Sequence, residues 1–168
     1  MGMTLAYAGM IEGKEVSWMP SYGPEMRGGT ANCIVIVSDT PVSSPIVTRF
    51  DVVVALNQPY ITKFEHAVKT RGILIYDSDV AIQPPLREDI TLIPIAADAL
   101  VAQLNNLKVR NMLLLGAFLE ATETVTIASV IEALKKVLPE RYHHLLGVNQ
   151  RALELGKHVA EEQLIATQ

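Results

Sequence analysis

The chain has 168 residues, a formal net charge of −4 and one cysteine; 49% of its residues are apolar or aromatic and 19% are charged. This length and apolar content predict a single domain with a substantial core and exclude intrinsic disorder. No block of lysine and arginine occurs, so a nucleic-acid partner is not expected. The apolar runs are shorter than the roughly 20 residues that a membrane helix needs, so we expect no membrane partner.

Two further features predict a cytoplasmic location. The start, Met-Gly-Met-Thr-Leu-Ala, lacks the basic region of a signal peptide. Cys33 is the only cysteine, so it forms no internal disulfide and cannot hold an iron–sulfur cluster alone. Because it lies in an apolar, strand-like run, we interpret it as an inert core thiol.

The first half of the chain alternates between helical and extended patterns. Residues 1–11 predict a helix of small and apolar residues, with Gly13 as its C-terminal glycine. Period-two alternation or near-continuous β-branched residues predict strands, and Pro59 marks a helix start. The resulting elements are strands over 14–19, 31–37, 50–56 and 72–76, with a helix over 60–70 between the last two.

The second half is predicted to be mostly helical. After a strand over 90–95, helices follow over 96–107, 111–120 and 127–137, and a last helix runs from 140 to about 163 with a frayed tail. The helix over 111–120 is apolar all round and should be buried, whereas 150–163 is polar enough for the surface, and 160–168 shows no packing face. This alternation predicts an α/β fold with a mainly parallel sheet flanked by helices.

The stretch from Ser21 to Gly29 differs chemically from the strands on either side. It contains three glycines, a Gly-Pro step, Glu25 and Arg27. Arg27 followed by Gly28-Gly29 could present a guanidinium together with bare backbone N–H groups, which suits an anion or a carboxylate. A plain connecting loop with a Glu25–Arg27 surface pair explains the pattern equally well.

No complete catalytic set emerges elsewhere. Asp77 and Asp79 follow a strand, where open sheets bind ligands, but turn or helix-capping roles are favoured. His143-His144 lacks metal-ligand spacing, so a solvated or capping role is expected. Asn57 at a strand end and Asn111 at a helix start are possible cleft-facing residues, with an N-cap favoured for Asn111.

The run Ser-Tyr-Gly-Pro-Glu-Met-Arg-Gly-Gly at 21–29, followed by Ala-Asn-Cys, resembles the γ subunit of 2-oxoacid:ferredoxin (acceptor) oxidoreductases, the family of pyruvate:ferredoxin oxidoreductase. The likeness continues through Val-Ser-Asp at 37–39, residues 51–57 and residues 111–117. It covers essentially the whole chain and implies a Rossmann-like γ domain over 1–168.

The resemblance implies that this chain is one subunit of a multi-subunit enzyme and is not catalytic by itself. In that family, α and β subunits hold thiamine diphosphate and magnesium, and the 2-oxoacid (2-oxoglutarate, pyruvate or a branched-chain acid) is converted to its acyl-CoA. Electrons leave through iron–sulfur clusters to ferredoxin. A ferredoxin-like δ subunit is also part of the complex. The γ subunit packs on α beside coenzyme A and binds no cofactor alone. The implied cofactor-binding or subunit-interface loop consists of Tyr22, Gly23, Pro24, Glu25, Arg27, Gly28 and Gly29.

The chain departs from the family at its beginning. Members open with a strand and a Gly-x-Gly-Gly-Gln-Gly loop before the first helix, and this sequence starts in that helix. The missing strand should leave unpaired backbone beside residues 51–56 or 14–19, so we expect the isolated chain to self-associate. Two alternatives stay open: a freestanding nucleotide- or acyl-CoA-binding α/β protein, and a purely structural interaction module.

Overall fold

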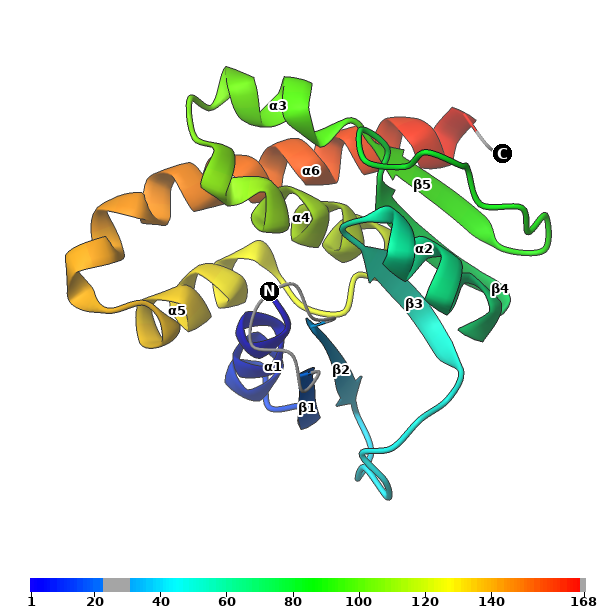
Figure 1. The fold of residues 1–168 in the computed structure, drawn as a ribbon. Coiled ribbons are helices and arrows are strands. Elements are labelled where there is room, and N and C mark those ends of the chain that lie inside the picture. Colours follow the sequence, from blue (N-terminus) through cyan, green and yellow to red (C-terminus); the bar gives the residue numbers. More distant parts are fainter. Residues whose placement is uncertain (23–30, 167–168) are drawn as a thin grey trace. The chain divides into compact units, whose positions relative to one another are not determined.

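The computed structural model describes residues 1–22 and 31–166. They form two compact units (Figure 1). The first contains residues 1–47 and 124–143, and the second contains residues 48–123 and those from 144 onward. No helix in the described part of the chain is long and apolar enough to cross a membrane.

The first unit is a hairpin packed by two helices. Strands β1 (Glu15–Tyr22) and β2 (Ala31–Ser38) pair antiparallel, with Glu15 opposite Ser38 and Tyr22 opposite Ala31. Helix α1 (Gly2–Ile11) packs on both strands and on α5 (Ile127–Val137). These bounds confirm the predicted first helix, both strands and the helix over 127–137.

Glu12 joins the two helices of this unit. Its Oε1 accepts hydrogen bonds from the backbone N of Thr126 at 2.7 Å and from Thr126 Oγ1 at 2.9 Å. Thr126 in turn caps α5 by accepting from the backbone N of Ser129 at 3.2 Å. Partial burial acts to raise the pKa of Glu12, but the hydrogen bonds from Thr126 and Ser129 outweigh it and leave that pKa below its ordinary value.

The second unit is a parallel sheet with helices packed on it, which confirms the predicted α/β class. The strand order is β3 (Phe50–Ala55), β4 (Val68–Asp77) and β5 (Thr91–Ile95). Helix α2 (Gln58–Phe64) packs with β3, α4 (Arg110–Thr122) with β4, and α6 (Leu146–Ala166) with β5. One core cluster contains Val53, Ala55, Ile61, Val68, Leu74, Tyr76 and Ile90.

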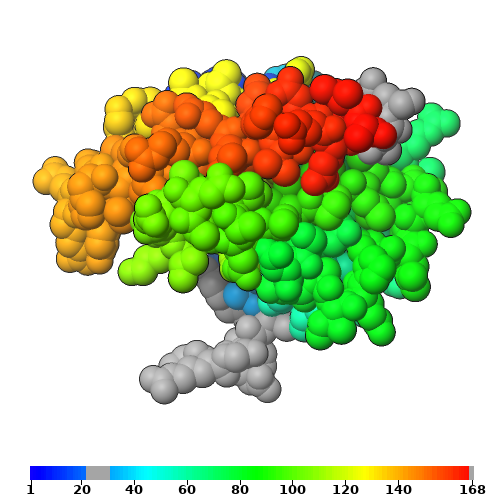
Figure 2. All heavy atoms as spheres, turned by 90° about the horizontal axis from the view of Figure 1, so that it is seen from above, coloured from blue at the N-terminus to red at the C-terminus, as the bar shows by residue number. Residues whose placement is uncertain are grey.

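Helices α4 and α6 lie side by side and nearly touch through their backbones (Figures 1 and 2). A Cβ placed on Gly116 would lie 2.0 Å from the carbonyl oxygen of Leu153, and one on Gly156 would lie 1.9 Å from that of Leu113. Each helix therefore presents a glycine to the backbone of the other. The apolar helix predicted over 111–120 is confirmed as buried.

Residues 150–163 lie on the surface as predicted and bury one stripe, whereas the prediction that residues 160–168 have no packing face was wrong. Ala152, Leu153, Gly156 and Ala160 of α6 are buried, and Gln163 donates from Nε2 to the carbonyl oxygen of Pro94 at 2.6 Å. Residues 160–163 therefore do pack. The packing stripe consists mainly of small residues, whose low hydrophobicity hides it in the sequence pattern.

Three predicted helix boundaries also needed correction. The helix expected over 60–70 ends at Phe64, is followed by a 3₁₀ turn (Glu65–Ala67), and gives way to β4 at Val68. The helix expected over 96–107 is α3 (Ala97–Gln103), followed by a separate 3₁₀ turn, Leu107–Val109. The final helix begins as a 3₁₀ segment, Glu140–Leu145, before α6. In the first case the pairing of β4 with β3 overrode local helix propensity.

Candidate functional site

The predicted loop of the first unit lies largely outside the described residues. Tyr22 ends β1, where its backbone pairs with Ala31 of β2. Gly23, Pro24, Glu25, Arg27, Gly28 and Gly29 fall outside the described ranges. Their assigned role therefore stays a prediction.

Cys33 differs from its predicted environment, because its side chain is exposed rather than buried in a core. The reason is the architecture of its sheet. A near-continuous apolar strand suggests burial on both faces, but β2 belongs to a two-stranded sheet and its burial along the strand is only partial.

Asn57 follows β3 at the carboxyl end of the parallel sheet. Its side chain accepts a hydrogen bond from the backbone N of Tyr60 at 3.2 Å and so caps α2. Asn111 is the second residue of α4, and the N-cap position belongs to Val109, so the N-cap prediction for Asn111 was wrong. The helix starts earlier because a 3₁₀ turn leads directly into it. Cleft-facing roles for both asparagines stay predictions.

An ionic cluster occupies the carboxyl end of β4. Asp77 is fully buried, and its Oδ2 accepts from Nη1 of Arg110 at 2.6 Å. Arg110 also bonds Asp98 at the start of α3 through Nη2. Asp79 accepts from the backbone N of Asp98 at 2.6 Å, which confirms the capping interpretation. We call these four residues the edge cluster.

The edge cluster holds the ends of three elements together. A fully buried carboxylate needs a charged partner, and the guanidinium of Arg110, 28% exposed, supplies it. Because Arg110 is shared between two carboxylates, its charge is neutralised within the protein. Sequence reasoning missed Arg110, since 33 positions separate it from Asp77 and no local pattern links them.

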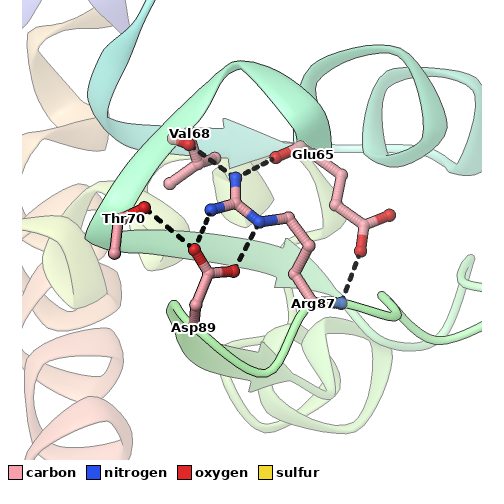
Figure 3. Close-up of polar contacts among 5 residues, drawn as sticks. All are labelled: Glu65, Val68, Thr70, Arg87 and Asp89. Carbon is pink, nitrogen blue, oxygen red and sulfur yellow. Dashed lines mark hydrogen bonds and ion pairs between the residues drawn. The ribbon is translucent and has the colours of Figure 1, made fainter.

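A second polar cluster lies at the opposite end of β4 (Figure 3). Arg87 donates from Nε to Asp89 Oδ1 at 2.7 Å and from Nη2 to Asp89 Oδ2 at 2.5 Å, a two-point ion pair. Its Nη1 donates to the carbonyl oxygens of Glu65 at 3.0 Å and Val68 at 2.5 Å. Thr70 Oγ1 adds a bond to Asp89 at 3.0 Å. We call this the anchor cluster.

The ion pair shifts the titration of both partners. The hydrogen bonds and charge of Arg87, with the bond from Thr70, lower the pKa of Asp89 to about 2. The bond to Asp89 raises the pKa of Arg87. Both groups therefore stay charged across the physiological range.

The described residues do not fit a resident metal ion or cluster. No group of three or more His, Cys, Asp or Glu side chains in this part of the chain could hold a metal. His143 instead donates from Nε2 to the carbonyl oxygens of Lys135 at 3.1 Å and Leu138 at 3.0 Å, at the end of α5. The capping interpretation of this histidine is confirmed.

The parallel sheet with its helices and the separate hairpin define an α/β chain whose described polar clusters hold structure together. Residues 1–159 match the family described as pyruvate ferredoxin/flavodoxin oxidoreductase, and the chain belongs to this family.

Curated relatives agree with this assignment. The chain is 35% identical, over 98% of its length, to ketoisovalerate oxidoreductase subunit VorA of Methanothermobacter thermautotrophicus, but it spans only 34% of that protein. It is 30% identical over 92% of its length to 2-oxoglutarate synthase subunit KorC of Methanocaldococcus jannaschii and covers 82% of it.

Solved structures show the same fold. The γ subunit of a keto/oxoacid ferredoxin oxidoreductase from Geobacter sulfurreducens is 26% identical and superposes with a TM-score of 0.78 over 96% of this chain and 89% of its own. A 2-oxoglutarate:ferredoxin oxidoreductase from Magnetococcus marinus, at 22% identity, shares the fold with a TM-score of 0.83 over 96% of this chain and 28% of its own.

Proposed function

We propose that this chain is the non-catalytic γ component of a thiamine-diphosphate-dependent 2-oxoacid:ferredoxin (acceptor) oxidoreductase, which decarboxylates a 2-oxoacid oxidatively to its acyl-CoA. The observation that carries this proposal is the family match over residues 1–159. It is supported by the end-to-end likeness to a solved γ subunit. The names of the relatives, which act on ketoisovalerate or 2-oxoglutarate, support a 2-oxoacid as the substrate class.

The proposed division of labour places the cofactors on other chains. The single cysteine and the absence of a metal-ligand grouping among residues 1–22 and 31–166 do not fit an iron–sulfur cluster or a resident ion on this chain. Thiamine diphosphate, magnesium and the clusters are therefore assigned to α-, β- and δ-type subunits. When bound, they supply decarboxylation and electron transfer to ferredoxin. The assembly is proposed to be cytoplasmic.

The part proposed for this chain is one wall of the coenzyme A side of the site. The loop of Tyr22 to Gly29 joins the two strands of the hairpin, and Arg27 is its only cation. We assign Arg27 to an anionic group, either a coenzyme A phosphate or a carboxylate of the partner chain, with Glu25 orienting it. A guanidinium binds such groups at two points, whereas lysine binds as a point charge.

Co-expression with α- and β-type chains tests the proposed function. The expected result is a stable complex that contains thiamine diphosphate and iron–sulfur absorbance and reduces ferredoxin only when a 2-oxoacid and coenzyme A are present. No co-purification, combined with a rise in melting temperature of the isolated chain on adding coenzyme A or a nucleotide, would instead support a freestanding binding protein. If the chain neither co-purifies nor is stabilised by a ligand, a purely structural module is the remaining explanation.

The same complex tests Arg27. Loss of a charge-assisted hydrogen bond removes about 1.5–3 kcal/mol, so Arg27→Ala should raise the KM for coenzyme A by about 10- to 100-fold, and Arg27→Lys by less. An unchanged KM together with unchanged assembly removes Arg27 from the site.

Self-association of the isolated chain also stays a proposal. Among the described strands, β3 pairs only with β4, so its other edge has no strand partner. An open edge of β-branched residues favours pairing with another chain. Sedimentation of the isolated chain as a concentration-independent monomer would contradict it.

A further inference from the structure

The segment of residues 82–87, between β4 and β5, has a backbone that is bonded to the second unit and apolar side chains that are exposed to solvent. Ile82 and Leu86 are each 86% exposed, and Pro84 is exposed between them. The alternate positions are attached to the second unit: the backbone of Gln83 is hydrogen-bonded, Pro85 is buried, and Arg87 belongs to the anchor cluster. We call this segment the apolar strip.

The attachments fix the backbone of the apolar strip. The backbone N of Gln83 donates to Gln58 Oε1 at 3.0 Å. Glu65 Oε1 accepts from the backbone N of Leu86 at 2.5 Å. It also accepts from the backbone N of Arg87 at 2.9 Å (Figure 3). The two adjacent prolines restrict the backbone further. Ile82 and Leu86 are thus held out on a preorganised segment, and little conformational entropy is lost when a partner binds them.

The chemistry of the apolar strip limits what can recognise it. The backbone N–H groups of Gln83, Leu86 and Arg87 are already engaged, and Pro84 and Pro85 have none. The strip therefore cannot donate a ladder of hydrogen bonds to an added strand or to an anion. What it offers is a row of apolar side chains at alternate positions.

The surrounding charge favours a protein partner. Residues 79–89 contain Asp79, Glu88 and Asp89 but only one cation, Arg87, which is paired with Asp89. The segment itself thus carries a net charge of −2, which does not attract nucleic acid or anionic lipid. A groove with an apolar floor and a Lys/Arg rim is complementary to it.

We propose that the apolar strip is a docking element that inserts Ile82, Pro84 and Leu86 into an apolar, basic-rimmed groove of another protein subunit. This inference rests on the proposed function, which supplies the partner as an α- or β-type chain of the oxidoreductase. The anchor cluster positions the strip and makes no contact of its own with the partner.

Binding of purified α- and β-type chains to this chain tests the proposal, with dissociation constants measured by interferometry. The variants are Ile82→Asn, Leu86→Asn and their double. Full burial of one such side chain corresponds to about a 10- to 100-fold gain in affinity, so each single variant should weaken binding by at least about tenfold and the double by more. The matched control is Ile165→Asn, which removes an aliphatic side chain that is 67% exposed on α6 and should change binding less than about twofold.

A variant of Arg87 tests how much the rigidity of the strip contributes to binding, apart from the contacts of its side chains. Arg87→Met removes the ties to Asp89 and Val68 and leaves all three outward side chains in place. Partner binding should weaken by several-fold, by less than in the double variant, because the untied strip must lose conformational entropy when it binds. Far-UV circular dichroism of Ile82→Asn and Leu86→Asn should match that of the parent, since both side chains are exposed.

The outcomes distinguish this inference from the proposed function. If the parent chain binds and the double variant binds equally well, the docking role is overturned while the proposed function stands. If the parent does not bind the α- and β-type chains at all, the proposed function fails and the assigned partner fails with it. Binding to phosphatidylcholine–phosphatidylglycerol vesicles, or self-association, that the double variant abolishes would also overturn the proposal, in favour of a lipid surface or a second copy.

Discussion

The crossing of α4 and α6 leaves no room for a methyl group at either glycine, and this gives the sharpest stability prediction. In Gly116→Ala the new Cβ would lie 2.0 Å from the carbonyl oxygen of Leu153, whereas ordinary contact begins at 3.4 Å. The helices would have to separate locally by about 1.4 Å. The obstacle is backbone, so no side-chain rotation relieves it.

Two opposing terms set the size of the effect. Overpacking of a core costs about 1–3 kcal/mol, and a rigid backbone obstacle places this site at the upper end. Alanine is better than glycine inside a helix by up to about 1 kcal/mol. The expected net loss for Gly116→Ala is therefore about 2 kcal/mol, or a fall in melting temperature of about 4–8 °C for a chain of this size.

Gly147 of the neighbouring helix, α6, supplies a control glycine. A Cβ at Gly147 would meet nothing within 4 Å. Gly147→Ala should therefore raise stability by up to about 1 kcal/mol, through helix propensity alone. Urea unfolding followed by circular dichroism measures both variants. If Gly116→Ala proves as stable as Gly147→Ala, the close backbone contact between α4 and α6 is refuted.

Three further predictions concern charges and buried polar groups. The pKa of Asp89 is depressed to about 2, so its ion pair with Arg87 stabilises the fold fully above its unfolded value near 4 and less as pH falls toward 2. Asp89→Asn should flatten the pH dependence of the urea midpoint in that window, and an unchanged slope would contradict the pairing. Arg110→Met should lower the free energy of unfolding by about 2–4 kcal/mol because Asp77 stays buried without its cation. The double variant with Asp77→Asn should recover part of this loss. If the losses of the two single variants simply add, the ion pair between Arg110 and Asp77 is contradicted. The Tyr60 hydroxyl is buried with no hydrogen-bond partner in the described structure, so Tyr60→Phe should be neutral or stabilising by up to about 1 kcal/mol in the same assay, and a clear loss would reveal a partner.

Much of the fold follows from local sequence pattern. Residues 50–55 form a strand because β-branched side chains fill both of its faces, and α5 begins after Thr126 because that side chain caps it. Such signals act over a few residues, which is why the sequence alone predicts the bounds of these two elements. The α/β class follows from the alternation of strands and helices.

The predictions failed where distant residues decide the outcome. Nothing near Lys69 indicates that the helix after Pro59 gives way to β4, because the strand forms by pairing with β3. Cys33 was placed in a core that a two-stranded sheet does not provide. The buried stripe of α6 was missed because glycine and alanine have little hydrophobic signal of their own.

The sequence by itself determined the family and the loop of Tyr22 to Gly29 that carries the resemblance, because those are properties of contiguous residues. Tertiary structure alone decided which charges are paired and which apolar groups stay exposed. Asp77 finds Arg110 across 33 positions, and Glu65 ties down the backbone at Leu86 across 21. The apolar strip could be recognised only in this way, since Ile82 and Leu86 resemble core residues until the fold leaves them in solvent.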